Sequence, residues 1–348
     1  MRLSWAALAR SSSVRLVVGA AIGLVLLAVT IARVDLGAVV AVLAAAAAPT
    51  LLVAVAVVLF DLGIRGVRWQ VLLRGVRPEG RSAPDDRTPL RLAVAYLTIG
   101  YLANVLLPAR LGDLARAYLA GAAFRLPRLP TLGTIMVERV ADGGTMLGLA
   151  VLSSLVVAGI AAVHTLALYA LVLAAAGLGA LALAWWFLVR TPFGRTSPGR
   201  VVRDVAARLS AGMAAARTLP GAVSIVVATL AAAGTATLVA WLVSGAVGIA
   251  LSPAQATLFM SAIALSLAIP AAPGSLGTYE FVGVVVLTSL GHTAERAFAT
   301  IVLMRAVSTF PPIALGIVST WVLHLRPAAI LESAGTMSAS GIGGTARS

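Results

Sequence analysis

The sequence contains no cysteine and no lysine, and only three histidines occur among its 348 residues. The absence of cysteine excludes disulfides, thiol catalysis and cysteine-based metal sites. The histidines, His164, His292 and His324, are too widely separated to suggest a zinc site. Charge is also scarce, because 11% of the residues are charged, 60% are hydrophobic and the mean hydropathy is +1.03. This composition excludes an ordinary soluble domain and predicts a polytopic membrane protein.

Positive charge is the exception to this scarcity, because the 26 basic residues are all arginine and the formal net charge is +14. In a soluble protein such an excess would suggest nucleic acid. Here the arginines lie mostly between apolar segments, as the positive-inside rule and contact with anionic headgroups predict. We therefore expect membrane lipid and no nucleic acid as the partner.

Apolar runs long enough to cross a bilayer need about 20 residues. We predict spans at residues 15–32, 38–60, 131–159, 164–189, 221–249 and 297–323. The first run is long for a signal peptide, so we expect it to stay uncleaved. The predicted fold class is all-α, a polytopic membrane helical bundle with about six spanning helices and two re-entrant helical hairpins.

The hairpins are predicted where Pro and Gly interrupt the apolar segments 90–123 and 254–290. The halves on either side of each break are too short to span a bilayer. A break inside the membrane frees backbone groups that lipid cannot satisfy, so it must face protein or a polar cavity. Paired breaks in two halves of a chain are the best sequence pointer to a transporter's binding site.

The arginines also predict the orientation. The loops 61–91 and 190–217 are rich in arginine, whereas the predicted outer segments hold only Arg33 and Arg296. The positive-inside rule then places both termini in the cytoplasm, in a plasma (inner) membrane. Under this topology the two hairpins enter from opposite sides, which predicts an inverted repeat.

Weak internal similarity favours the same repeat, since Leu107-Pro-Ala109 resembles Ile269-Pro-Ala271. The predicted organisation is one transmembrane domain, residues 1–332, with repeats at about 38–159 and 221–323 and a disordered tail at 333–348.

Residues 200–217 alternate with the period of an amphipathic helix. One face carries Val205 and Leu209, and the other carries Arg203 and Arg208. We expect this helix to lie on the inner membrane surface.

Charges at mid-membrane cost about 2.5–3.5 kcal/mol each on insertion scales, so they are functional candidates by default. Acidic and basic residues occur there in equal number: Arg110, Asp113, Arg116, Glu138, Arg139, Asp142, Glu280 and Arg305. Glu138 and Asp142 are four residues apart and share a helix face. The group forms either a salt-bridge cluster that locks helices together or the wall of a polar cavity.

The two breaks favour different roles for their charges. Asp113 and Glu280 each fall near the start of a half-helix, where a carboxylate can simply cap the helix. A cation is disfavoured there, so Arg110 is better explained as the partner of a bound anion. The predicted substrate-binding residues are Asn104, Arg110, Asp113, Arg116, Glu138, Arg139, Asp142, Pro273, Gly274, Gly277, Tyr279, Glu280 and Arg305.

A second group precedes the first break, where Arg65 and Arg68 share a helix face with Asp61, and Trp69 is adjacent. These side chains are either an interfacial anchor or the first contact for lipid headgroups that come from the inner leaflet.

At this point the motifs resemble a known family, the lysylphosphatidylglycerol synthase transmembrane region, also called flippase-like. The resemblance extends over roughly residues 15–325. It is carried by Asn104, Pro108, Arg110, Gly112, Asp113, Arg116, Glu138, Arg139, Asp142, Pro273, Gly274, Gly277 and Glu280. It implies a helical membrane domain that moves or handles lipids. We expect no lysyl transfer, because no room is left for the soluble aminoacyl-transferase domain to which such regions can be fused.

The leading hypothesis is a lipid flippase, or a transporter of a lipid-linked substrate, that needs no cofactor or metal and is not an enzyme. A carboxylate that loses its arginine to a phosphate is more readily protonated, so proton coupling is a natural extension. A homo-oligomer is compatible with the sequence. One alternative is an integral membrane glycosyltransferase with a polyprenyl-linked donor, for which Asp85 and Asp86 would hold a metal. The other is an accessory subunit without transport activity.

Overall fold

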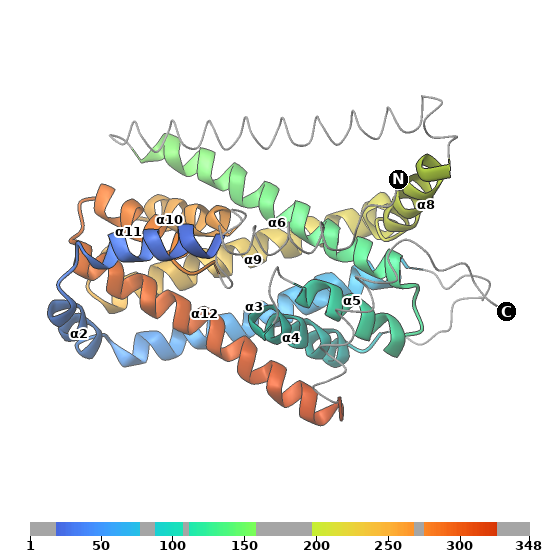
Figure 1. The fold of residues 1–348 in the computed structure, drawn as a ribbon, viewed down its shortest axis with the longest axis horizontal. Coiled ribbons are helices and arrows are strands. Elements are labelled where there is room, and N and C mark those ends of the chain that lie inside the picture. The colour runs from blue at the N-terminus through green and yellow to red at the C-terminus, as the bar shows by residue number, and fades with distance from the viewer. Residues whose placement is uncertain (1–18, 77–87, 107–110, 158–196, 268–274, 326–348) are drawn as a thin grey trace. The chain divides into compact units, whose positions relative to one another are not determined.

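The computed structural model describes residues 19–76, 88–106, 111–157, 197–267 and 275–325, and their regular elements are all helical. The helices are Gly19–Ile31, α2 (Leu36–Ala44), α3 (Ala48–Arg74), α4 (Leu90–Leu106), α5 (Gly112–Ala123), α6 (Arg128–Val156), α8 (Ser197–Ala211), the 3₁₀ turn η3 (Ala215–Arg217), α9 (Leu219–Ala246), α10 (Pro253–Ser266), α11 (Thr278–Ser289) and α12 (Ala294–Val322) (Figure 1). This confirms the all-α class, and the helix predicted at 200–217 is α8 followed by η3.

Three helices in the described ranges are long and apolar enough to cross a membrane, namely α3, α9 and α12. At 1.5 Å per residue each is roughly 40 Å long, which exceeds the ~30 Å hydrocarbon core. The last two match the spans predicted at 221–249 and 297–323. The helix α6 has 29 residues and covers the predicted span 131–159 almost completely, but it carries Glu138, Arg139 and Asp142 within its length.

The predicted span 38–60 is wrong. The helix α2 ends at Ala44, and α3 begins at Ala48 and continues to Arg74. One long-range and one local feature explain this boundary. The N–H of Ala47 donates to the carbonyl of Ala246 at 2.9 Å, and Pro49 suits the first turn of a helix. The residues assigned to the start of a cytoplasmic loop are therefore helical.

The first predicted span, 15–32, is the helix Gly19–Ile31 in its described part. The helix Gly19–Ile31 is followed by α2 at an angle of 83°. Asp35 starts α2 as its N-cap, since its Oδ1 accepts from the N–H groups of Gly37 and Ala38 at 2.7 and 3.2 Å. The predicted span 164–189 lies outside the described residues.

The two interrupted segments are each a pair of short helices, as predicted. The first pair, α4 and α5, has 17 and 12 residues, and the second, α10 and α11, has 14 and 12. All four are shorter than the ~20 residues that a span requires. Within each pair the helices pack against each other (Figure 1). The breaks themselves, 107–110 and 268–274, lie outside the described residues, and the inverted repeat remains a prediction.

The chain divides into two compact units. Unit 1 comprises Met1–Leu59, Met146–His164 and Ala233–Pro311, and unit 2 comprises Phe60–Thr145, Thr165–Ala232 and Pro312–Ser348. Unit 1 therefore contains the pair α10–α11 and unit 2 contains the pair α4–α5.

Each unit has its own apolar core. In unit 1, residues of α10, α11 and α12 pack together, including Phe259, Ile263, Leu287, Ile301 and Met304. In unit 2, residues of α3, α4, α5 and α9 pack together, including Trp69, Leu72, Ile99, Leu119 and Ile225. Each half-helix pair is thus held by apolar packing within its own unit, which fixes the charged side chains described below.

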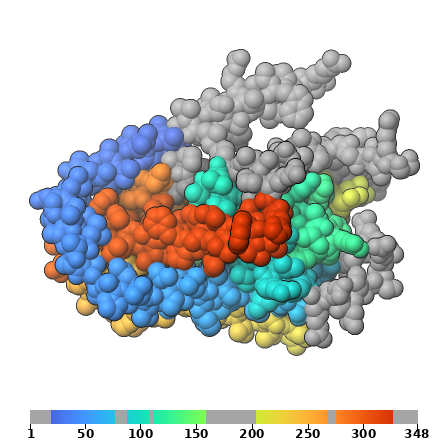
Figure 2. All heavy atoms as spheres, turned by 90° about the horizontal axis from the view of Figure 1, so that it is seen from below, coloured from blue at the N-terminus to red at the C-terminus, as the bar shows by residue number. Residues whose placement is uncertain are grey.

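Large apolar side chains are also abundant on the surface. Figure 2 shows one exposed side of α12, coloured orange to red. Among the side chains of α12, Phe310 and Trp321 are 68% and 78% accessible. Exposed apolar side chains recur on α3 and α9, for example at Phe60 and Val227. An apolar surface of this extent is unfavourable in water and fits a hydrocarbon environment.

Candidate functional site

In unit 2, the side chain of Arg68 lies at the centre of a buried charged cluster. Arg68 projects from α3 and is 2% exposed. Its Nη1 donates to Asp142 Oδ1 on α6 and to Thr229 Oγ1 on α9, the latter at 3.0 Å, while Nη2 donates to Asp142 Oδ2 at 3.1 Å. Its Nε is 3.6 Å from Glu138 Oε1. One guanidinium therefore ties three helices of unit 2 together.

The second buried cation of this cluster is Arg116 on α5, which forms an ion pair through Nη2 with Glu138 Oε2. Its guanidinium carbon lies 4.0 Å from the ring centroid of Trp69. The indole Nε1 of Trp69 in turn donates to Thr134 Oγ1 on α6 at 3.0 Å. Glu138 thus faces two arginines, and removal of this carboxylate would leave two buried cations without their shared counter-charge.

Asp61 and Arg65 extend the cluster along α3. Arg65 Nε donates to Asp61 Oδ2 at 2.6 Å, and its Nη1 is 3.5 Å from Asp142 Oδ2. The acidic residues Asp61, Glu138 and Asp142 balance the basic residues Arg65, Arg68 and Arg116. The cluster is neutral at rest, which lowers the cost of keeping it inside a membrane protein.

The ion pair between Asp113 and Arg139 differs from this cluster in its exposure. Arg139 Nε and Nη2 donate to Asp113 Oδ2 and Oδ1 at 3.0 and 2.8 Å, so the pair is bidentate. The side chain of Arg139 is 46% exposed and that of Asp113 is 22% exposed. Arg139 lies roughly 17 Å along α6, a helix of roughly 43 Å. A charge at membrane depth is costly, so an exposed arginine within a helix long enough to cross a bilayer is a candidate for contact with a polar ligand or cavity.

The junction between α4 and α5 positions Asp113. Asn104 Oδ1 accepts from the N–H of Gly112 at 2.9 Å, which joins the end of α4 to the start of α5. A Cβ at Gly112 would lie 2.3 Å from the carbonyl oxygen of Gly100. Only glycine fits this close approach of two backbones. Since Asp113 directly follows Gly112, the junction also fixes the position of Asp113.

In unit 1, the corresponding charged pair is Glu280 on α11 and Arg305 on α12. Arg305 Nε lies 2.6 Å from Glu280 Oε1, and its guanidinium carbon lies 4.4 Å from the ring centroid of Tyr279. Arg305 Nη2 also donates to the carbonyl of Ser275 at 3.4 Å. Arg305 is 27% exposed, whereas Glu280 is 8% exposed.

The second carboxylate oxygen of Glu280 binds the backbone of its own helix. Glu280 Oε2 accepts from the N–H of Gly277 at 2.7 Å, which satisfies one backbone donor at the start of α11. Gly277 has φ +88°, and a Cβ there would lie 1.8 Å from the carbonyl oxygen of Gly23. Glu280 therefore caps its helix, as the sequence allowed for both acidic residues. Both oxygens of Asp113, in contrast, accept hydrogen bonds from Arg139.

The structure brings most of the predicted substrate-binding residues together within their units. Asn104, Asp113, Arg116, Glu138, Arg139 and Asp142 gather in unit 2. Gly277, Tyr279, Glu280 and Arg305 gather in unit 1. Arg110, Pro273 and Gly274 lie outside the described residues, as do Asp85 and Asp86.

The three residues predicted as an interfacial anchor or a first headgroup contact lie mostly buried within unit 2. Arg68 is 2% exposed and Trp69 is fully buried, while Arg65 is 20% exposed. Because α3 continues to Arg74, these side chains contact α5, α6 and α9. Their role as an anchor or as a first headgroup contact stays a prediction. Sequence reasoning missed Thr134 and Thr229, since single threonines in an apolar helix give no distinctive signal.

The fold and the site together define a class: a helical membrane protein with several apolar spans, two pairs of short half-helices, and compensated charges beside them. The chain belongs to the family described as lysylphosphatidylglycerol synthase TM region, whose model matches residues 16–316. The resemblance proposed from the sequence is thereby confirmed. No curated protein matches the chain.

Proposed function

We propose that the protein moves a polar lipid or a lipid-linked substrate across the plasma membrane, and that the Asp113–Arg139 pair is its headgroup site. The observation that carries this proposal is the exposure of a bidentate ion pair near the middle of α6. An isolated structural pair gains nothing from such exposure, whereas a binding site requires it. The buried cluster around Glu138 supports the site by fixing α5 and α6 in unit 2.

The chemistry of the pair suits an anionic or zwitterionic headgroup. A phosphate presents to Arg139 the same two-oxygen edge that Asp113 presents, so it can accept both hydrogen bonds of Arg139 in place of the carboxylate. The released Asp113 then binds an amine of a zwitterionic headgroup, or takes up a proton when the headgroup is purely anionic. Proton coupling follows only in the second case.

Transport, rather than chemical change of the lipid, is the activity we propose for this site. The family match supports a membrane protein. The orientation with both termini in the cytoplasm follows from the arginine distribution in the sequence. Binding by an exposed ion pair and release after a conformational change need no nucleophile or metal.

The test uses purified protein in vesicles of phosphatidylcholine that contain traces of fluorescent phosphatidylglycerol or phosphatidylethanolamine. Dithionite added outside the vesicles quenches the fluorescent lipid in the outer leaflet. The rate at which the fraction of lipid protected in the inner leaflet falls measures transport. We expect Arg139→Ala to lower this rate at least about tenfold, a loss of ~1.4 kcal/mol. Because Arg139 is 46% exposed, the free energy of unfolding of this variant should be only about 0–1 kcal/mol lower than that of the unaltered protein.

The matched control is Arg203→Ala, which removes an exposed arginine of α8 in the same unit. This variant should transport at the rate of the unaltered protein. Arg139→Lys keeps the charge but loses the bidentate fork, so an intermediate rate is expected. The proposal fails if no tested lipid crosses faster with the unaltered protein than in protein-free vesicles.

A further inference from the structure

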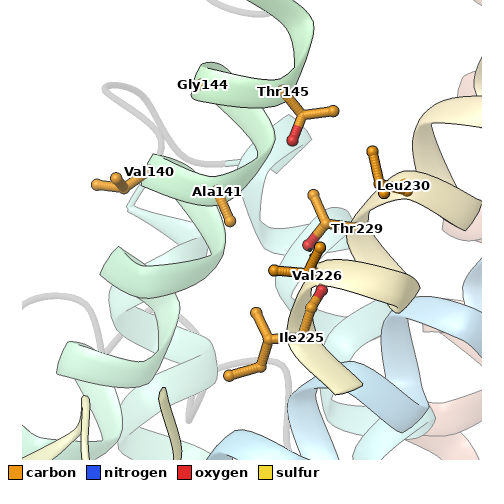
Figure 3. Close-up of a pocket in the computed structure, with 8 residues that line it drawn as sticks. All are labelled: Val140, Ala141, Gly144, Thr145, Ile225, Val226, Thr229 and Leu230. Atoms are coloured by element: carbon orange, nitrogen blue, oxygen red, sulfur yellow. Dashed lines mark hydrogen bonds between the residues drawn. The ribbon is translucent and has the colours of Figure 1, made fainter. Parts of the chain in front are cut away.

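Unit 2 also contains a groove between α6 and α9 that the headgroup site does not use. It is lined by Val140, Ala141, Gly144 and Thr145 on α6 and by Ile225, Val226, Thr229 and Leu230 on α9, and its volume is about 270 Å³. Ala141 and Thr145 extend toward α9, while Ile225 and Thr229 extend toward α6 (Figure 3). Apart from the two threonine hydroxyls, the lining side chains are apolar or absent.

The rim of the groove is apolar and exposed. Val140, Val226 and Leu230 are 64%, 56% and 54% accessible. Contact of these side chains with hydrocarbon carries no free-energy cost, whereas their exposure to water is unfavourable. The rim of the groove is therefore suited to contact with hydrocarbon chains.

The floor of the groove is connected to the charged cluster through Thr229, which is 3% exposed. Its Oγ1 accepts from Arg68 Nη1 at 3.0 Å and donates to the carbonyl of Ile225 at 2.7 Å. Arg68 also binds Asp142, which directly follows the groove residue Ala141 on α6. The apolar groove thus lies beside the compensated charges of the buried cluster and on the same helix, α6, as Arg139 of the proposed headgroup site.

From these observations we infer that the α6–α9 groove holds a segment of one acyl chain of the lipid whose headgroup the protein handles. This inference rests on the proposed function and adds to it a site for the apolar part of the substrate. The size of the groove favours a chain segment over other occupants. Its volume lies just below the ~300–1,000 Å³ of sites that enclose a whole small molecule.

A helix of a second copy of the chain fits this groove poorly. The lining residues span 140–145 and 225–230, which corresponds to roughly 8 Å along each helix. A helix with its side chains is about 10–12 Å wide, and packed helices lie about 8–10 Å apart over several turns. A single hydrocarbon chain, in contrast, needs neither this width nor this length.

The test is photolabelling with phosphatidylglycerol that carries a diazirine on one acyl chain, at trace level in phosphatidylcholine vesicles that contain the purified protein. After irradiation, mass spectrometry of proteolytic peptides locates the adducts. We expect adducts to concentrate on the groove residues of α6 and α9. Even labelling of all exposed apolar side chains of these helices would overturn the inference, as would an irradiation-dependent covalent dimer joined through the groove.

Two neighbouring valines of α9 provide a matched pair of variants. Val226 lines the groove and Val227 does not, although they are similarly exposed, at 56% and 60%. We expect Val226→Trp to lower groove labelling about tenfold, equivalent to ~1.4 kcal/mol, and Val227→Trp to leave it unchanged. Equal effects of the two variants would contradict the inference.

Gly144→Leu fills the groove from the opposite wall. No heavy atom lies within 4 Å of a Cβ built at Gly144, so the variant should fold. It should lower groove labelling as Val226→Trp does, and unchanged labelling would count against the groove. The dithionite assay separates the two proposals. Groove labelling without transport would contradict only the proposed transport function. Transport with evenly spread labelling would contradict only the binding of an acyl chain in the groove.

Discussion

The two pairs of half-helices carry their charges in different ways. Beside α4 and α5, the buried carboxylate of Glu138 faces both Arg68 and Arg116. Beside α10 and α11, a single carboxylate faces a single arginine, and one of its oxygens also caps the helix. The first arrangement crosslinks several helices of unit 2, and the second fixes one helix start against α12 in unit 1.

The difference also distinguishes the two acidic residues of the proposed headgroup site and of the α11 cap. Glu280 has a structural task in the backbone of α11, so its release would leave the N–H of Gly277 without its acceptor. Asp113 binds Arg139 through both oxygens at a half-exposed position. Under the proposed function, a headgroup would displace Asp113 at lower cost than Glu280. The three experiments that follow compare the contributions of the two charged sites to stability.

The largest effect is expected from Glu138→Ala. This change leaves Arg68 and Arg116 buried without their shared carboxylate, so the free energy of unfolding should fall by about 3–5 kcal/mol. The measurement is unfolding of the protein in mixed micelles with increasing dodecyl sulfate. Glu138→Gln keeps the volume and two hydrogen-bonding atoms and should lose less. If the Glu138→Ala variant were as stable as the unaltered protein, Glu138 would not be the required counter-charge of Arg68 and Arg116.

The glycines beside the breaks should give the next largest effects, and they should differ from each other. A Cβ at Gly112 or Gly277 overlaps a backbone carbonyl, which costs about 1–3 kcal/mol. Gly277 also has φ +88°, which adds about 1–2 kcal/mol for an L-residue. We therefore expect Gly277→Ala to be the more destabilising change in the same unfolding experiment.

Gly143→Ala serves as the control for these glycines, because its Cβ meets no atom within 4 Å on α6. It should stabilise the helix by up to about 1 kcal/mol. If Gly112→Ala behaves like Gly143→Ala, the close approach between α4 and α5 is not required for folding.

The smallest effect is expected from Glu280→Gln. The amide oxygen still accepts from the N–H of Gly277, and only the charge toward Arg305 is lost. Since Arg305 is 27% exposed, the free energy of unfolding should fall by about 1 kcal/mol or less. A loss as large as that of Glu138→Ala would abolish the distinction between the two sites.

Much of the fold could be predicted from the sequence, because membrane helices are local and apolar. The spans at α9 and α12 and both broken segments follow from the apolar runs and from Pro and Gly. The start of α3 could not be predicted so well, since the chain from residue 38 to residue 60 is apolar on both sides of the turn. The turn depends on Ala47, whose partner is Ala246, far away in the sequence.

The members of the site were largely predictable, but their pairing was not. Helical spacing showed that Glu138 and Asp142 share a face of one helix and that Asp61, Arg65 and Arg68 share a face of another. Nothing local shows that the two faces meet, because Arg68 and Asp142 are 74 residues apart. The burial of Trp69 was missed for the same reason, since an Arg-Trp sequence is also typical of a membrane interface.

The position of Trp69 makes the buried cluster visible to spectroscopy. Its indole is shielded from solvent, stacks against the guanidinium of Arg116 and donates to Thr134. Trp241 and Trp321, in contrast, are 48% and 78% accessible. With the other tryptophans changed to phenylalanine, the emission maximum of this single indole would report, without any added label, whether the charges of unit 2 stay together during the transport cycle that we propose.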